Sequence, residues 1–219
     1  MRPKIVVEGT VGAGKTTLIR VISERLGLKP LYELTDEKIV DLLSNFYADP
    51  AKWGFHLQIY FLTKRFQQIE LAKQIGNVVM DRCIFCDHIF PTVLLKRREM
   101  NQLEYEIYRE VQREFLKYSV PPQLMIYLRC STRTAIERIK KRGRNWELVI
   151  DEAYWHALNV EYERYFADYD LSSLLIVESD SMDESFSNIE NAIVSVLETE
   201  EKGVWLYDGK ELKRRNQRA

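Results

Sequence analysis

The stretch Ile5-Val6-Val7-Glu8-Gly9-Thr10-Val11-Gly12-Ala13-Gly14-Lys15-Thr16-Thr17 decides the fold of this chain. Its apolar start predicts a strand and the amphipathic sequence after it predicts a helix, with the pattern G-x-x-x-x-G-K-[ST] between them. Glycines let main-chain N–H groups converge on phosphate oxygens, while Lys15 would reach the outer phosphates and the Thr16 hydroxyl would hold Mg²⁺. An ordinary glycine-rich turn is the alternative, but both flanking elements favour an anion site at the helix N-terminus. The pattern therefore predicts a nucleoside triphosphate site formed by Gly9, Gly12, Ala13, Gly14, Lys15, Thr16 and Thr17.

Length and composition limit the class of protein. The chain has 219 residues, of which 46% are hydrophobic, which suits one domain with a sizeable core over residues 1–219. A formal net charge of −1 gives no general basic field, so we expect small-molecule partners and not nucleic acid. No apolar stretch resembles a signal peptide or a membrane span, so we expect a cytoplasmic protein that does not enter a membrane.

The three cysteines are too few for a disulfide framework. Cys83 and Cys86 form a C-x-x-C pair, and Cys130 stands alone. A zinc site is the alternative for the pair, but no second pair of cysteines or histidines accompanies it at ligand spacing. We therefore expect free thiols in a reducing compartment.

Short apolar runs alternate with longer helical patterns along the chain. This alternation predicts a three-layer α/β fold in which helices flank a parallel sheet of about five strands. The strands are expected at 4–8, 30–33, 77–81, 124–129 and 174–178. Helices are expected at 15–26, 37–46, 51–73, 84–96, 102–118, 132–141, 151–168 and 183–198. The segment 203–210 could add a strand and a turn, and the basic tail after it is expected to be solvated.

Polar residues at the carboxyl ends of the expected strands are the first candidates for catalysis, because ligands of open parallel sheets bind there. Glu33 could accept the proton of an attacking hydroxyl. Asp81 could hold Mg²⁺ directly or through water, and Arg82 could neutralise charge on a phosphoryl group in transfer. A solvated edge residue and a plain ion pair are the alternatives, and the presence of the phosphate loop favours the catalytic interpretation.

A run of basic residues from 138 to 147 is the next candidate. Arg138 and Arg142 are four residues apart on one expected helix face, and Gly143 permits a break just before Arg144. Arginines that close over the phosphates would stabilise charge and exclude water. The run therefore predicts a lid at about 138–149, with a solvated helix face as the alternative.

Two polar residues interrupt an otherwise apolar helical pattern. Gln58 and Arg65 are seven residues apart and so project from the same face of the expected helix. If both are partly buried, they could read the edge of a base by paired hydrogen bonds. If both reach solvent, they have no such role, and the helical pattern alone does not decide between the two.

These motifs together resemble those of the deoxynucleoside kinase family, which has a P-loop nucleoside and nucleotide kinase fold. The resemblance covers most of the first 170 residues and is closer to the cytosine- and purine-accepting branch than to thymidylate kinases. It is carried by the phosphate loop and by Tyr32-Glu33, Phe55-His56-Leu57-Gln58-Ile59-Tyr60-Phe61-Leu62-Thr63-Lys64-Arg65, Met80-Asp81-Arg82 and Arg138 through Glu147.

The resemblance implies a catalytic assignment for several residues. Glu33 matches the general base that takes the proton from a nucleoside 5′-hydroxyl. Asp81 matches the acid that assists Mg²⁺, and Arg82 matches the arginine that contacts the 5′ oxygen and the phosphates. Lys15 and the lid arginines Arg138, Arg142 and Arg144 would bind the phosphates of ATP.

The resemblance also implies how the acceptor is bound. Tyr47 and Glu147 match residues that hydrogen-bond the sugar 3′-hydroxyl, and Gln58, Arg65 and Asp87 match residues that read the base. Adenine, guanine and cytosine stay open, and a homodimer is implied as well.

The sequence departs from the family pattern at three positions. Cys83 stands where a serine is common, and Leu34 stands where a proline often follows the base. Pro91 replaces an aromatic residue that stacks on the base in many relatives, so Phe90 or Phe85 would have to supply that contact.

Two other functions stay open on the motifs alone. A nucleoside monophosphate kinase such as thymidylate kinase shares the loop, the Asp-Arg pair and the lid, but Glu33 would repel the acceptor's phosphate. A nucleotide-dependent switch is the second alternative, although no Asn-Lys-x-Asp guanine-reading motif is found. The expected function is ATP-dependent phosphorylation of a deoxynucleoside in nucleotide salvage.

Overall fold

A seven-stranded sheet forms the centre of the molecule in the computed structural model, which describes residues 2–33, 37–144, 151–182 and 185–215. The strand order is β2-β3-β1-β4-β5-β6-β7, and every neighbouring pair is parallel except the antiparallel pair β6 and β7. The strands are β1 Ile5–Glu8, β2 Lys29–Leu31, β3 Val78–Asp81, β4 Leu124–Arg129, β5 Ser173–Glu178, β6 Val204–Tyr207 and β7 Leu212–Arg214.

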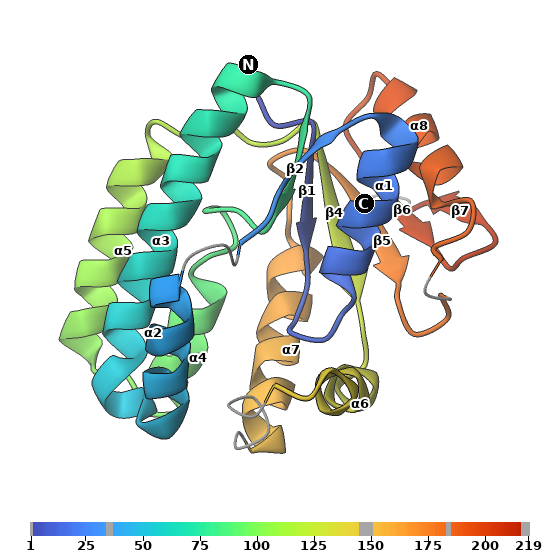
Figure 1. Cartoon of the computed structure of the whole chain (residues 1–219). Helices are drawn as coiled ribbons and strands as arrows, with labels where there is room; N and C mark the ends of the chain where they lie inside the picture. Colours follow the sequence, from blue (N-terminus) through green and yellow to red (C-terminus); the bar gives the residue numbers. More distant parts are fainter. Residues whose placement is uncertain (1, 34–36, 145–150, 183–184, 216–219) are drawn as a thin grey trace.

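Helices cover both faces of this sheet (Figure 1). They are α1 Lys15–Leu26, α2 Glu37–Ala48, α3 Pro50–Ile75, α4 Ile89–Lys96, α5 Gln102–Leu116, α6 Thr132–Arg142, α7 Glu152–Ala167 and α8 Ile189–Glu198. Helices α1 and α8 pack on one face and contribute to one hydrophobic core, whereas α2, α3, α4, α5 and α7 contribute to the other. The predicted three-layer α/β fold is therefore confirmed.

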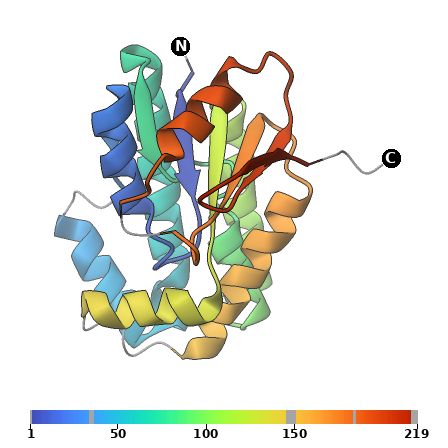
Figure 2. The ribbon, with the colours of Figure 1, turned by 90° about the vertical axis from the view of Figure 1, so that its right-hand side faces the viewer.

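The strand β1 shows how the sequence builds these two cores. Ile5 and Val7 belong to the core on the α1 side, and Val6, which points to the opposite face, belongs to the other core. All three side chains are fully buried, as the continuous apolar run of a central parallel strand requires. The chain leaves β1 at the carboxyl edge of the sheet, where α6 crosses beneath the strands (Figure 2). This edge is where the site forms.

The strand predicted at 30–33 was placed too far along the chain, since β2 ends at Leu31. Its neighbour β3 ends at Asp81, and Arg82 then adopts a positive φ of 69° that turns the chain out of the sheet. Tyr32 and Glu33 consequently lie beyond the last residue pair of these strands, which joins Leu31 and Met80. Glu33 is therefore a loop residue and not the end of a strand.

Two predicted helix starts were also wrong. The helix predicted from residue 84 begins at Ile89, because Pro91 lacks an N–H and is tolerated only in the first turn of a helix. The helix predicted from residue 183 begins at Ile189, after Phe186 and Asn188 with φ of 47° and 60°. Left-handed backbone at these two residues is incompatible with a continuing right-handed helix.

The possible strand expected at 203–210 is confirmed as β6, and a further strand, β7, forms at the start of the segment that was expected to be a solvated basic tail. Strands β6 and β7 form a hairpin at the edge of the sheet, with Trp205 paired to Arg214 and its side chain buried. The Arg214 guanidinium lies 5.6 Å from the centre of the Trp205 ring. None of the helices in the described part of the chain combines the length and apolar character needed to cross a membrane.

Candidate active site

The phosphate loop joins β1 to α1 and has a backbone that only glycine allows. Gly12 and Gly14 have φ of 83° and 101°. A Cβ atom at Gly12 would lie 2.4 Å from the carbonyl oxygen of Ala135 in α6. The first turn of α1 reads Lys-Thr-Thr-Leu and so carries no carboxylate to compete with an anion. This helix N-terminus is therefore suited to binding phosphate.

Lys15 lies over the same loop. Its Nζ donates hydrogen bonds to the carbonyl oxygens of Gly9 and Thr10, each at 3.1 Å. Burial, assisted by the nearby charge of Arg82, lowers the pKa of Lys15 to about 8. The negative charge of a bound phosphate would favour the protonated form and oppose this shift. Lys15 is thus placed to exchange its two carbonyl contacts for phosphate oxygens.

Arg138 fastens α6 to the phosphate loop. Its Nη1 donates to the carbonyl oxygen of Ala13 at 3.1 Å and to Oγ of Ser179 at 2.6 Å, and its Nη2 donates to the Ser179 carbonyl oxygen at 2.9 Å. The Ser179 hydroxyl also donates to the Ala13 carbonyl oxygen, at 2.6 Å. These contacts fasten α6 beside the loop at Arg138, within the helix.

The helix α6 ends where the sequence suggested a break. Gly143 caps it in the left-handed conformation with φ of 70°, and its N–H donates to the carbonyl oxygen of Ile139. Arg142 and Arg144, on either side of this glycine, both line the central cavity. The rest of the lid expected at 138–149, including Glu147, lies outside the described residues.

A cavity of about 580 Å³ opens beside the phosphate loop. One part of its wall carries phosphate-loop and lid residues, among them Lys15, Thr16, Thr17 and Arg138. Another part carries residues of the acceptor side that the sequence predicted, which are Glu33, Tyr47, Gln58, Arg65, Asp81 and Arg82. The structure therefore brings the two predicted groups of residues to one continuous cavity, large enough for a small-molecule ligand.

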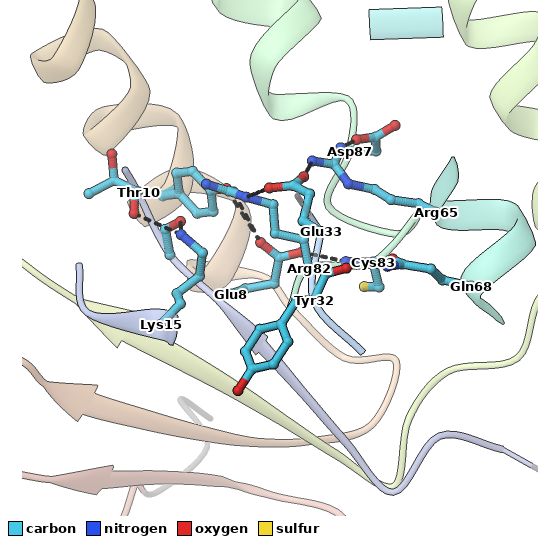
Figure 3. Close-up of polar contacts among 12 residues, drawn as sticks. Glu8, Thr10, Lys15, Tyr32, Glu33, Arg65, Gln68, Arg82, Cys83 and Asp87 are labelled. Atoms are coloured by element: carbon cyan, nitrogen blue, oxygen red, sulfur yellow. Dashed lines mark hydrogen bonds and ion pairs between the residues drawn. The ribbon is translucent and has the colours of Figure 1, made fainter. Parts of the chain in front are cut away.

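Glu33 lies between two arginines on this wall (Figure 3). Oε1 pairs with Nη2 of Arg65, and Oε2 accepts a hydrogen bond from Nε of Arg82 at 3.2 Å. Burial acts to raise the pKa of Glu33, but the guanidiniums of Arg65 and Arg82 outweigh burial and hold this pKa below its usual range. Glu33 is therefore an ionised carboxylate at neutral pH, able to accept a hydrogen bond from a hydroxyl group.

Asp81 ends β3 close to Lys15 and Arg82. Burial raises the pKa of Asp81 to about 6, even though the charge of Lys15 acts in the opposite direction. Its Oδ1 is buried and finds no hydrogen-bond partner among the described residues. A buried, unsatisfied carboxylate oxygen beside a phosphate loop has the chemistry that Mg²⁺ prefers. Thr16, which also lines the cavity, offers a hydroxyl oxygen as a second ligand.

Gln58 and Arg65 project from α3 into the same cavity, and both are only 2% exposed. The solvent-exposed alternative for these residues is thus wrong. Asp87 lies on the other side of Arg65, with one carboxylate oxygen paired with Nη1 of Arg65. Its second oxygen accepts a hydrogen bond from the Tyr108 hydroxyl at 2.8 Å. Asp87 is not among the described residues that line the cavity, and Arg65, with which it pairs, is.

The aromatic residue at the cavity wall near Arg82 is Phe90. Its ring centre lies 4.8 Å from the Arg82 guanidinium. Pro91 and Phe85 are absent from the described residues that line the cavity. Of the two substitutes named for the missing aromatic residue, Phe90 is therefore the one that reaches the site.

Some residues of the site were missed by sequence reasoning. Glu8 is a buried carboxylate at the end of β1, and its only sequence signal is its place directly before the phosphate loop. Ser179 follows β5 in the same way, and it binds Arg138. Apolar wall residues such as Phe46, Phe61 and Tyr154 read in the sequence as ordinary core positions.

A sequence model described as deoxynucleoside kinase matches residues 5–204 of this chain. The chain belongs to the deoxynucleoside kinase family. The match includes every residue of the cavity and leaves out most of the C-terminal hairpin. The enzyme is thus a phosphotransferase, as its motifs predicted.

Individual relatives agree with this assignment. A deoxyadenosine/deoxycytidine kinase of Bacillus subtilis is 33% identical over 207 residues, which are 90% of this chain and 94% of that protein. A deoxyguanosine kinase of Lactobacillus acidophilus is 36% identical over 199 residues, which are 87% of this chain and 86% of that protein. Among solved structures, deoxyadenosine kinase from M. mycoides with bound dATP is 35% identical, with a TM-score of 0.78 over 90% of this chain and 99% of that chain.

Proposed function

We propose that this deoxynucleoside kinase transfers the γ-phosphoryl group of ATP to the 5′-hydroxyl of deoxyadenosine, deoxyguanosine or deoxycytidine in nucleotide salvage. The observation that carries the proposal is the position of Glu33, an ionised carboxylate on the wall of a cavity that the phosphate loop also lines. A carboxylate at that place suits an uncharged hydroxyl as acceptor, because it would repel an acceptor that already carries a phosphate.

In this mechanism the 5′-hydroxyl donates a hydrogen bond to Glu33 and attacks the γ-phosphorus in line with the leaving ADP. Glu33 takes up the proton as the new O–P bond forms. Arg82, which already contacts Glu33, would neutralise charge on the transferring phosphoryl group. Lys15 and the lid arginines Arg138, Arg142 and Arg144 hold the phosphates of ATP. No covalent intermediate on the enzyme is required.

Mg²⁺ fits the oxygen atoms that the site offers. Thr16 and Asp81 would hold it, and the unsatisfied Oδ1 of Asp81 supports this assignment. When bound, the ion would neutralise phosphate charge and orient the leaving group.

For the nucleoside, we propose that Gln58 and Arg65 bind the edge of the base and that Tyr47 binds the sugar 3′-hydroxyl. Both base contacts are buried and line the cavity, so their hydrogen bonds would form away from water. Asp87 would hold Arg65 in place for this role. The names of the relatives cover adenine, guanine and cytosine, and the proposal includes all three bases.

We further propose that the enzyme is a homodimer. Leu103 and Ile107 lie one turn apart on α5 and are 66% and 42% exposed, and Leu71 on the neighbouring α3 is 42% exposed. Apolar side chains exposed on adjacent helices favour burial against a second copy. Light scattering after gel filtration would give the mass, and a monomer at micromolar concentration would contradict this proposal.

The acceptor's 5′-hydroxyl can be tested with a single chemical change. ADP release from Mg²⁺-ATP is measured with deoxyadenosine, deoxyguanosine or deoxycytidine and, as the matched control, with the 5′-deoxy analogue of each active nucleoside. We expect a nucleoside to stimulate ADP release and its 5′-deoxy analogue to have no effect. ADP release at the same rate with and without an acceptor would instead support the nucleotide-dependent switch.

A further inference from the structure

The carboxylate of Glu8 is buried behind the catalytic arginine. Glu8 ends the central strand β1 and is 1% exposed. Its Oε1 accepts a hydrogen bond from the main-chain N–H of Cys83 at 2.9 Å. Its Oε2 lies 3.6 Å from Nη1 of Arg82 and accepts a hydrogen bond from the Tyr162 hydroxyl at 3.3 Å. Both oxygens of this carboxylate are therefore used, and both face the segment that contains Arg82.

The hydroxyl of Tyr162 links the Glu8 carboxylate to the Arg82 guanidinium. Its hydroxyl accepts a hydrogen bond from Nη1 of Arg82 while it donates to Glu8, so the donor and acceptor roles of all three groups agree. The Tyr162 ring stacks against Tyr127, with ring planes 6° apart, and is itself 1% exposed. A rigid, stacked tyrosine gives the guanidinium a fixed hydrogen-bond acceptor.

The backbone of Arg82 is held as firmly as its side chain. Its N–H donates to the carbonyl oxygen of Val7 at 3.0 Å, one residue before Glu8. Its positive φ of 69° is uncommon for a residue with a side chain and persists only where the surroundings enforce it. The hydrogen bond from the N–H of Cys83 to Glu8 fixes the next peptide group. The end of β1 thus holds the segment 82–83 in a conformation that it would not otherwise favour.

From this geometry we infer that Glu8, with Tyr162, positions the Arg82 guanidinium for phosphoryl transfer. The inference rests on the role proposed above for Arg82. Arg82 lines the cavity, whereas neither Glu8 nor Tyr162 is among the described residues that do so. On the cavity side the guanidinium contacts Glu33, and on the buried side it contacts Glu8 (Figure 3). Tyr162 also contacts it on the buried side. Glu8 and Tyr162 are therefore positioning residues and not catalytic ones.

A metal ion is the other use that these residues could have. Ligand atoms of Glu8, Cys83 and Cys86 lie within 4.8 Å of one another, and all three residues are buried. Burial, however, raises the pKa of the Cys86 thiol well above its usual value, which disfavours the thiolate that a metal requires. The Glu8 oxygens also already have partners of their own. A role for Glu8 in positioning Arg82 therefore explains the contacts of Glu8 better than a metal site does.

The expected loss of activity on replacing Glu8 follows from the role of its carboxylate. Glu8→Gln keeps the shape of the side chain and an oxygen for the Cys83 N–H, but it removes the charge that faces Arg82. Arginine has a long, flexible side chain, and displacement of a catalytic group by about 1 Å can cost on the order of 100-fold in rate. We therefore expect kcat to fall by about 10- to 100-fold, while KM for the nucleoside changes by less than about 3-fold.

The test is a double-mutant cycle of Glu8→Gln and Arg82→Lys with saturating Mg²⁺-ATP. If Glu8 acts through Arg82, the double variant has the kcat of Arg82→Lys alone, because no guanidinium is left to position. Tyr162→Phe keeps the stacked ring, and we expect it to lower kcat about 3- to 10-fold. It provides a second measurement if Glu8→Gln folds poorly.

Glu161→Gln is the matched control. Glu161 is a buried carboxylate next to Tyr162 in sequence that pairs with Lys96, and it is not among the described residues that line the cavity. We expect it to change kcat by less than about 2-fold even if it lowers stability.

The outcomes separate this inference from the proposed function. Losses that multiply in the double variant, or an unchanged kcat in Glu8→Gln, would overturn the positioning role while the kinase activity stands. A wild-type enzyme that phosphorylates no deoxynucleoside would overturn the proposed function itself, and the positioning role with it.

Discussion

Arg65 joins two buried carboxylates, so its replacement should have a large and pH-dependent effect on stability. Its side chain is 3% exposed and pairs with Glu33, which is 13% exposed, and with Asp87, which is fully buried. Arg65→Met keeps most of the side-chain volume and leaves both carboxylates without this partner. Removal of one partner from a buried ion pair costs about 3–5 kcal/mol. For a domain of this size, that loss corresponds to a fall in Tm of roughly 6–20 °C.

The loss of stability in Arg65→Met should depend on pH in one definite direction. Although burial opposes it, Arg65 lowers the pKa of Glu33 in the folded protein. This interaction therefore adds stability above the carboxyl pKa of the unfolded chain, and the stability is lost as the pH falls through the lower folded value. The difference in free energy of unfolding between wild type and Arg65→Met should consequently shrink once the pH falls below the carboxyl pKa of the unfolded chain.

Urea unfolding at several pH values measures this difference. Arg129→Met is the matched control, because Arg129 pairs with Glu178 through side chains that are 35% and 33% exposed. Partly exposed pairs contribute little, so we expect the control to lose less than about 1 kcal/mol. The reasoning is refuted if Arg65→Met is as stable as the control, or if its loss is the same at pH 3 and pH 7.

Three further predictions concern the chemistry of the site. Glu33→Gln should lower kcat by about 10²- to 10⁴-fold with little change in nucleoside KM, and near-normal turnover would remove Glu33 as the base. Gly12→Ala should abolish ATP binding in a titration, because its Cβ would lie 2.4 Å from a carbonyl oxygen of α6; Gly27→Ala, with φ of 62° but open space around it, should bind ATP normally. Since burial raises the pKa of Asp81 to about 6, kcat/KM for ATP should decline below that pH as the carboxylate takes up a proton, and a flat profile to pH 5 would show that ionised Asp81 is not needed.

The sequence predicted the layers of the fold better than the ends of its elements. Apolar runs such as Ile5-Val6-Val7 have one stable place, the centre of a covered parallel sheet, and periodicity reveals them. The end of β2 depends instead on its pairing with β3, whose last residue pair with β2 joins Leu31 and Met80. A tertiary constraint of this kind has no local signal, and so the predicted strand ran on to Glu33.

The residues of the candidate site also fall into two groups, those that the sequence could predict and those that it could not. Residues within motifs, such as Lys15 and Glu33, could be named from the sequence because the chemistry restricts which residue types can occur there. Glu8 and Ser179 could not be named, because each acts by holding an arginine that is distant in the chain. The burial of Gln58, which the helical pattern left undecided, depends on how α3 packs against the rest of the domain.

The most direct measurement of the central claim compares two acceptors that differ only by a phosphate. The wild-type enzyme is incubated with Mg²⁺-ATP and either a deoxynucleoside or its 5′-monophosphate, for adenine, guanine, cytosine and thymine, and the products are separated by chromatography. We predict that at least one of the adenine, guanine and cytosine deoxynucleosides is converted to its 5′-monophosphate and that no monophosphate is converted to a diphosphate. A diphosphate formed only from a monophosphate would contradict the claim, because the acceptor would then place a phosphate next to the Glu33 carboxylate.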